Sequence, residues 1–176
     1  MNSFKISNKL FCTFIPIQLN SNPKKILLKL RKQFPELKIQ LLNSDSIIGQ
    51  DHLIWAVKQT YKAQIRKILL AKKFEIDLLL RLSVTNQINK AIKFTGALSS
   101  EQNLIVISLG NKNQLNHFNL WIENNFKILP VIHYGNQKEI LKKLKINYSV
   151  SNFAKKDIPL LLLSHSALIF TDKNKK

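Results

Sequence analysis

The sequence predicts an α+β fold in a single domain, with a small mixed or antiparallel sheet packed with several amphipathic helices. Strand-like and helical segments mix along the chain without the strict βαβ alternation that builds a parallel sheet. Residues 104–109 (LIVISL) are the clearest buried strand, whereas residues 47–97 have the apolar spacing of helices. With 176 residues, 45% of them hydrophobic, the chain can bury a core. We therefore expect one domain over residues 1–176, with residues 171–176 as a disordered tail.

The N-terminal part predicts a strand, a helix, a second strand and a turn, at residues 10–17, 24–34, 37–42 and 43–50. Pro16 marks an edge or an end of the first strand, because proline cannot donate to a strand ladder. Asn22 and Pro23 begin the helix, and Pro35 stops it. The second strand alternates polar and apolar residues, which is typical of a half-buried strand.

Residues 51–73 predict one long helix, which Asp51 or a close neighbour should cap. An apolar stripe at helical spacing should face the core: Ile54, Val57, Tyr61, Ile65 and Ile68. After a short apolar helical turn and a polar junction at residues 83–87, a second helix is predicted at residues 84–95. This helix should bury Val84, Ile88, Ala91 and Ile92.

The C-terminal part predicts a helix, a strand and a short basic helix after the buried strand, at residues 116–126, 128–134 and 137–144. Residues 158–170 are apolar enough to form a core element, either helix or strand. They are too short and too often interrupted by polar residues to span a membrane, which takes about 20 apolar residues. We expect no signal peptide and no membrane partner, and therefore a cytoplasmic protein, with the nucleus as the alternative in a eukaryote.

The formal net charge of +18 indicates an acidic partner such as nucleic acid. The sequence is also crowded with Lys, Asn and Ile, as expected from an AT-rich genome, and this bias inflates lysine at tolerant surface sites. Only Arg31, Arg66 and Arg81 are arginines. They carry more weight, because the planar guanidinium fits phosphate as lysine cannot.

The residues that known catalytic and cofactor sites need are not arranged for those roles. The four glycines are far apart, which excludes a P-loop and a dinucleotide fingerprint. Cys12 is the single cysteine and the four histidines lack metal-ligand spacing, so neither a disulfide nor a metal site is expected. Ser164, His165 and Ser166 are adjacent and point apart, so a nucleophile and base pair is not expected there. We expect no enzyme activity and no cofactor.

The long helix predicts a basic face that suits a single-stranded nucleic acid. The residues on it are Trp55, Gln59, Lys62, Arg66 and Lys73. Cations can contact phosphates while the ring stacks on an unpaired base. The alternative is a partly buried Trp55 at the edge of the apolar stripe, beside solvated lysines.

The junction before the second helix gathers further polar residues: Arg81, Ser83, Thr85, Asn86 and Gln87. Ser83 or Thr85 should cap the second helix, whose first amides favour an anion. Asn86, Asn89, Lys90 and Lys93 should point outward. Ordinary helix capping explains Ser83 and Thr85 equally well.

Three segments within residues 51–96 together resemble the small tRNA-binding subunit of the KEOPS complex, a TPRKB-like kinase-binding family. They are Asp51-His52-Leu53 with Ala56, then Glu75 to Ser83, then Thr85 to Ile88 with Ala91, Ile92 and Gly96. The apolar residues 160–170 are also similar to the family's ending. The chain departs from the pattern at Asp77 and in its lysine-rich surface.

The resemblance implies a non-catalytic subunit that docks on a kinase-like ATPase and holds tRNA, including its unpaired CCA end. Through that ATPase it would support the threonylcarbamoyl transferase that modifies the adenosine beside the anticodon. The expected tRNA-binding residues are Trp55, Lys62, Arg66, Lys73, Arg81, Ser83, Thr85, Asn86, Gln87 and Lys90. Residues 160–170 should complete the core or contact the partner, with Leu161, Leu162 and Ala167 as the candidate contacts. The alternatives are a generic basic RNA-binding protein and a purely protein-binding regulator of a kinase.

Overall fold

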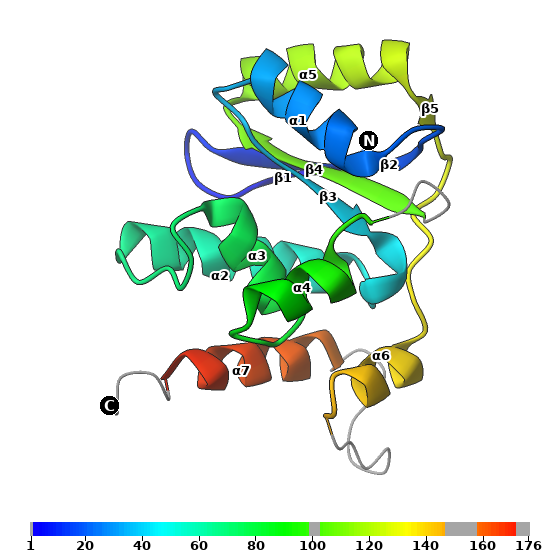
Figure 1. The fold of residues 1–176 in the computed structure, drawn as a ribbon. Coiled ribbons are helices and arrows are strands. Elements are labelled where there is room, and N and C mark those ends of the chain that lie inside the picture. Colours follow the sequence, from blue (N-terminus) through cyan, green and yellow to red (C-terminus); the bar gives the residue numbers. More distant parts are fainter. Residues whose placement is uncertain (1, 99–102, 147–157, 172–176) are drawn as a thin grey trace. The chain divides into compact units, whose positions relative to one another are not determined.

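The computed structural model combines an antiparallel sheet with helices, and it describes residues 2–98, 103–146 and 158–171 (Figure 1). The predicted α+β class is confirmed. The chain forms two compact units: unit 1 is Met1–Ser44 with Gly96–His133, and unit 2 is Asp45–Thr95 with Tyr134–Lys176. A single domain stays a prediction, and residues 172–176 of the expected tail lie outside the described part.

Unit 1 contains a sheet in the order β1-β2-β4-β3, and β5 also pairs with β2. Its strands are β1 (Asn2–Lys5), β2 (Phe11–Gln18), β3 (Lys38–Asn43), β4 (Leu104–Gly110) and β5 (Lys127–Ile128). Every pair is antiparallel. Pro16 lies in β2 between the stretch that pairs with β1 and the stretch that pairs with β5, so its missing N–H removes no ladder bond there.

Two helices of unit 1, α1 (Pro23–Gln33) and α5 (Lys112–Asn125), cover one face of this sheet (Figure 1). The Asn22 side chain caps α1, as predicted, by accepting from the amides of Lys24 and Lys25. Asn111 caps α5 through a reciprocal capping box with Gln114. The core beneath both helices holds Ile15, Ile17, Leu30, Phe34, Ile39, Leu41, Leu104, Val106, Leu115, Phe118 and Ile122.

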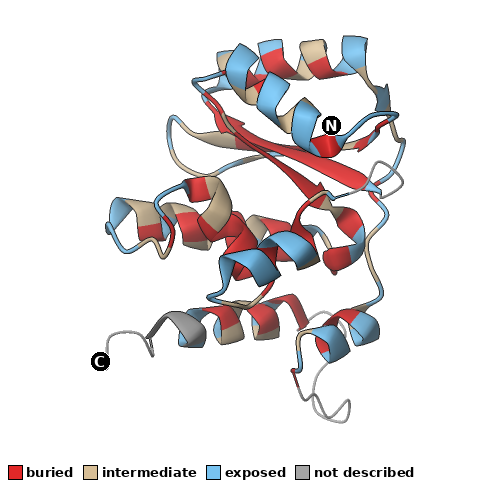
Figure 2. Ribbon diagram, in the orientation of Figure 1, coloured by how far each residue is buried: buried red, intermediate tan, exposed pale blue. Residues whose placement is uncertain are grey.

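Several predicted boundaries in unit 1 need correction. β4 is buried at all seven positions, as predicted, and β3 is buried at its four central positions rather than on one face (Figure 2). The predicted strand at 128–134 is only the two-residue β5. α5 begins four residues earlier than predicted, because the Asn111 capping box starts it. β1 was not predicted at all.

Unit 2 contains the helices α2 (Gln50–Ile65), α3 (Phe74–Leu82), α4 (Ile88–Thr95), α6 (Gln137–Lys143) and α7 (Ile158–Thr171). A 3₁₀ turn, Ser44–Ser46, precedes α2. Of the predicted caps, Asp51 lies in the first turn of α2, and its close neighbour Gly49 occupies the N-cap position, without a side-chain hydrogen bond. Residues 158–170 were predicted as helix or strand and are helical.

The predicted core stripe of α2 is only partly confirmed: Val57 is buried and Ile54 and Tyr61 are half-buried, but the last two residues of the stripe are not in the core. Ile65 and Ile68 are 63% and 60% exposed, and the buried residues are His52, Leu53, Ala56, Val57, Thr60 and Ala63. The buried face therefore uses small side chains, which allow close packing, and the Thr60 hydroxyl is satisfied by the Ala56 carbonyl (2.9 Å). α2 also ends at Ile65 rather than continuing to residue 73.

Three helices of unit 2 end in the same backbone motif without glycine. After α2, α3 and α6 the chain takes a left-handed conformation at Lys67 (φ 57°), Val84 (φ 46°) and Lys145 (φ 56°). In each motif the amide of this residue bonds the carbonyl three residues back, and the next amide bonds the carbonyl five residues back. This is the Schellman pattern. Glycine is usual in it, because the left-handed conformation costs other residues roughly 1–2 kcal/mol of conformational energy.

Replacing Lys67 by glycine should therefore stabilise the protein by about 0.5–1 kcal/mol, since Lys67 is exposed and only its backbone is strained. Urea unfolding measures the change. Lys62→Gly is the matched control: Lys62 is exposed but helical, so its replacement should destabilise by about 1 kcal/mol. Destabilisation by both changes would contradict strain at Lys67.

Candidate nucleic-acid interface

Side-chain hydrogen bonds hold the backbone of the junction between α3 and α4 in unit 2. Ser83 is buried, and its hydroxyl donates to the Leu79 carbonyl (2.6 Å), so it closes α3 and does not cap α4. The Thr85 hydroxyl accepts from the Gln87 amide (3.2 Å), and α4 begins at Ile88 rather than at Val84. Asn86 and Gln87 are exposed, as the outward position of a binding residue requires.

A hollow of about 570 Å³ lies against this junction. It is lined by Ser83, Val84, Thr85, Lys90, Lys93, Phe94, Lys143, Leu144 and Lys145. α4 and the end of α6 thus bring four lysines to one site, and among the described residues no carboxylate lines it. Phe94, Val84 and Leu144 give it apolar walls. Such a site can hold phosphate groups at the lysines and an aromatic base against Phe94.

Of the predicted residues, Ser83, Thr85 and Lys90 line the hollow, and Asn86 and Gln87 lie next to them in the chain. The other lining residues were not predicted as contacts: Val84, Lys93, Phe94, Lys143, Leu144 and Lys145. The available signal was the basic helix at 137–144, but nothing in the sequence places it beside α4. α4 also differs from the prediction in its buried face: Ala91 is buried, whereas Ile88 and Ile92 are 46% and 36% exposed and Val84 is half-buried.

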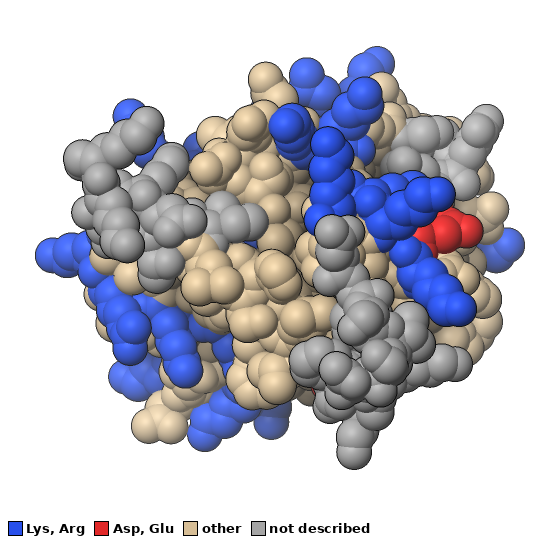
Figure 3. All heavy atoms as spheres, turned by 90° about the horizontal axis from the view of Figure 1, so that it is seen from below, with Lys and Arg blue, Asp and Glu red and all other residues tan. Residues whose placement is uncertain are grey.

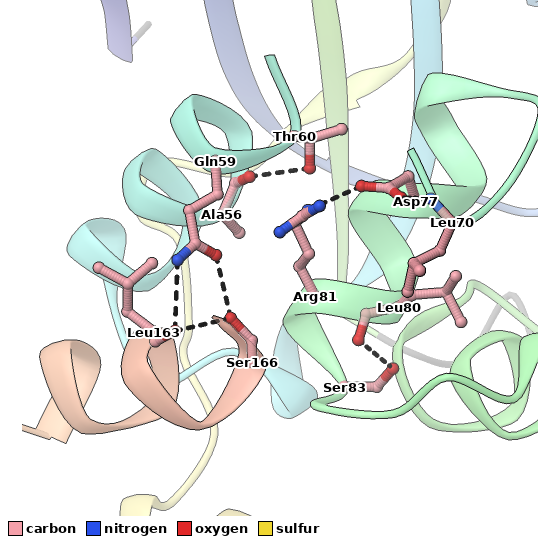
Figure 4. Close-up of polar contacts among 10 residues, drawn as sticks. All are labelled: Ala56, Gln59, Thr60, Leu70, Asp77, Leu80, Arg81, Ser83, Leu163 and Ser166. Carbon is pink, nitrogen blue, oxygen red and sulfur yellow. Dashed lines mark hydrogen bonds and ion pairs between the residues drawn. The ribbon is translucent and has the colours of Figure 1, made fainter. Parts of the chain in front are cut away.

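Arg81 is not on the surface where a phosphate contact would place it. Its side chain is 7% exposed, and its Nε donates to Asp77 Oδ2 at 2.7 Å (Figure 4). Asp77 Oδ1 accepts from the Leu70 amide, also at 2.7 Å. Arg81 and Asp77 are four residues apart in α3, the spacing at which helical side chains meet. The structure therefore contradicts the exposed position expected for Arg81 and gives it a structural role.

The predicted basic face of α2 is only partly present. Trp55 is 41% exposed, with the Lys58 amine 5.3 Å from the centre of its ring, and Lys62 and Arg66 are exposed. Lys73 is exposed, but it is the N-cap residue of α3 and lies beyond the end of α2 at Ile65. These residues do not line the hollow.

α7 contributes to the core, which is one of the two roles predicted for residues 160–170. Leu162 is 1% exposed within a cluster with Ile48, Ile140, Leu141, Ile146 and Ile158, and Leu161 packs against it. Gln59 of α2 donates to the Leu163 carbonyl (3.2 Å) and accepts from the Ser166 hydroxyl (2.9 Å), as Figure 4 shows. Ala167 is exposed. Leu162 is therefore a core residue rather than a partner contact.

The outer face of α7 carries no charge. Leu160 and Leu168 are 58% and 60% exposed, and Ser164 and Ala167 lie between them. Figure 3, which views unit 2 from the side of α6 and α7, shows Lys and Arg side chains in separate groups with uncharged surface between them. In so basic a chain, this apolar helix face suits a protein partner better than an RNA.

His52 is buried in α2, and burial lowers its pKa from 6.5 to about 4. Neither of its ring nitrogens has a hydrogen-bond partner among the described residues. His52 lies against Pro159 and Leu162 of α7 at a small internal gap, so its charged form would be buried without compensation.

Residues 2–98, 103–146 and 158–171 contain neither a group of metal-ligating side chains nor a membrane-spanning helix. No three His, Cys, Asp or Glu side chains are grouped closely enough there to hold a metal ion. No helix there has the length and apolarity to cross a membrane.

A family model described as kinase binding protein CGI-121 matches residues 18–165, which is most of the chain. The chain belongs to the CGI-121 family. The match confirms the resemblance to a TPRKB-like kinase-binding protein. The CGI-121 match includes all the residues that line the hollow and α7 as far as His165. The comparison with curated proteins found no match.

The buried His52 predicts an acid-sensitive fold. The pKa of His52 is lower in the folded chain than in the unfolded chain. Its contribution to the free energy of unfolding is therefore complete above pH 6.5 and is lost as pH falls towards 4. The loss should be about 2–3 kcal/mol by pH 4.5. Urea unfolding at pH 7.5 and 4.5 measures it; His52→Leu should reduce the pH dependence by that amount, and the exposed His133→Gln should leave it unchanged. Equal pH dependence in both variants would exclude His52 as the cause.

Proposed function

We propose that this kinase-binding protein is the non-catalytic KEOPS subunit that holds the single-stranded 3′ CCA end of tRNA in the hollow beside α4. The observation that carries the proposal is the group of four lysines around apolar walls, next to exposed amides at the start of α4. It would support threonylcarbamoyladenosine formation by the transferase, to which the kinase-like ATPase connects it.

The chemistry of the hollow suits an unpaired strand end. Lysine amines contact phosphates without reading sequence, and Phe94 offers an aromatic face to an unstacked base. Asn86 and Gln87 can read base edges, which are accessible only in unpaired nucleotides. The volume of about 570 Å³ falls within the 300–1,000 Å³ typical of pockets for compact ligands. Trp55, Lys62, Arg66 and Lys73 remain candidates for a further part of the tRNA.

Two alternatives predict different ligands. A generic basic RNA-binding protein would bind RNA with or without a free CCA end. A purely protein-binding regulator would bind the kinase and no RNA. The convergence of four lysines on one hollow favours an anionic ligand over the second alternative, because the like charges repel one another and an anion there would offset that repulsion.

Charge reversal in the hollow tests the RNA proposal. Lys90→Glu with Lys143→Glu should weaken binding of a tRNA with an intact CCA end about tenfold or more. It should also lower the slope of log affinity against log salt by roughly 0.7 for each lost phosphate contact. Fluorescence anisotropy measures both quantities. The control pair Lys5→Glu with Lys127→Glu makes the same charge change at exposed lysines of unit 1.

The same tRNA without CCA separates the alternatives. It should bind the wild-type protein weakly and show little further loss in the Lys90/Lys143 variant. If the truncated tRNA binds as tightly as the intact one, the protein is a generic RNA binder. If neither RNA binds, the protein-only alternative holds.

The uncharged face of α7 is the proposed docking surface for the kinase-like ATPase. Leu160→Glu with Leu168→Glu should weaken kinase binding in titration calorimetry by at least tenfold, because both side chains would carry charge into an apolar contact. Leu28→Glu with Leu120→Glu is the control, since these leucines are equally exposed but belong to unit 1. Unchanged kinase affinity in the folded α7 variant would move the docking surface elsewhere.

A further inference from the structure

The outer face of α1 in unit 1 is a row of cations without acidic neighbours in the helix. Lys24, Lys25, Lys29 and Lys32 are exposed, and α1 contains no Asp or Glu. Among the described residues, none of these four lysines forms an ion pair. Lys25 and Lys29 lie one helical turn apart, where like charges destabilise a helix. The arrangement therefore does not serve the stability of α1 itself.

Arg31 does not belong to this row. Its Nε and Nη2 donate to the Ile39 carbonyl (3.0 and 2.8 Å), and Nη2 also donates to Gln40 Oε1 (3.2 Å). The one arginine of α1 is thus bound to β3, whereas the lysine amines remain in solvent.

Trp121 of α5 holds one of these lysines over the neighbouring helix. The Lys29 amine is 5.7 Å from the centre of the Trp121 ring, within the range of a cation–π contact. Phe34 and Phe126 pack against the same ring in edge-to-face geometry, with centroids 5.7 and 5.8 Å away. The ring is therefore fixed in place, and it supports Lys29 rather than offering a free face to a base.

α5 adds further hydrogen-bonding side chains beside the lysine row. Asn113, His117 and Asn124 are exposed, and they lie on the side of α5 that carries Trp121, at spacings of four and seven residues. The His117 ring contacts the ring of Phe34, with 5.7 Å between the two ring centroids, and Phe34 directly follows α1. The combined α1–α5 face is rich in cations and donors, the composition that contacts phosphate and ribose oxygens.

We propose that the α1–α5 face binds the sugar–phosphate backbone of base-paired RNA, without reading its sequence. Lys25, Lys29 and Lys32 extend over seven residues of helix, about 10 Å, and can meet successive phosphates. Because the Lys29 amine already lies over the Trp121 ring, the contact is ionic rather than a stacking contact, and a duplex presents its phosphates outward. This inference rests on the proposed function in one respect, the choice of RNA as the negatively charged ligand. The α1–α5 face belongs to unit 1, whereas the hollow belongs to unit 2.

Two short RNA probes test this face by fluorescence anisotropy: a blunt duplex and a single strand ending in ACCA. The variant Lys25→Glu/Lys29→Glu/Lys32→Glu should lose about 10- to 100-fold in affinity for the duplex, with a salt slope lower by about two to three, and keep its affinity for the single strand. The hollow variant Lys90→Glu/Lys143→Glu should show the reverse. Failure of the hollow proposal would change only the single-strand result.

The matched control is Lys5→Glu/Lys9→Glu/Lys127→Glu, which changes the charge of unit 1 equally at exposed lysines outside α1 and α5. It should retain most duplex affinity, and thermal melting checks that all variants fold. The proposal is overturned if wild-type protein does not bind the duplex, or if the α1 and control variants lose affinity equally. Displacement of the duplex by polyglutamate of equal charge would also overturn it, by assigning the face to acidic protein.

Discussion

Asp77 is fully buried in α3. One of its carboxylate oxygens accepts a hydrogen bond from a later residue of the chain, and the other accepts one from an earlier residue. One oxygen binds Arg81 a turn later in the same helix, and the other binds the Leu70 amide in the segment that leaves α2. A buried carboxylate is tolerated only when such partners are present, and removing one typically costs about 3–5 kcal/mol. The position of α3 against the end of α2, and with it the junction to α4, depends on this group.

The junction that follows is held in a conformation its residues do not favour. Val84 is β-branched, yet it takes a left-handed conformation, and its side chain packs against the cluster around Ile140 and Leu162. Lys145 repeats this conformation at the end of α6, and both residues line the hollow. Strained backbone of this kind persists where surrounding packing enforces it, and it is frequent at binding sites. The walls of the hollow are therefore fixed by the fold rather than formed by flexible loops.

The sequence predicted elements whose signals are local. The β4 strand is an uninterrupted apolar run, and α1 has an Asn-Pro start and a proline stop, so both were placed within a residue or two. β1 was missed because its four residues, NSFK, contain one apolar side chain and are a strand only through pairing with β2. The end of α2 was misplaced because Lys67 carries none of the usual signals of a helix end.

The candidate site shows the same distinction between residues with a local sequence signal and residues placed by tertiary packing. Thr85 and Lys90, which line the hollow, and the neighbouring Asn86 and Gln87 were chosen because they are close in sequence around one helix start, and their contact with RNA stays a prediction. Lys143 and Lys145 could not, because tertiary packing alone brings α6 beside α4. Arg81 was misassigned although its partner lies at the i+4 spacing, since the pair was read as two separate charges rather than as one neutralised unit.

The outer edge of β3 explains how unit 1 avoids joining other chains. The Ile39 carbonyl is occupied by the Arg31 guanidinium, and the Leu41 carbonyl accepts from the Ala97 amide (3.4 Å) beside the bridge between Leu42 and Gly96. On the opposite edge, β1 and β5 are only four and two residues long. Short or covered edges give a foreign strand few free groups to pair with. Polymerisation through this sheet is therefore disfavoured, as is binding of a ligand that would add a strand to it.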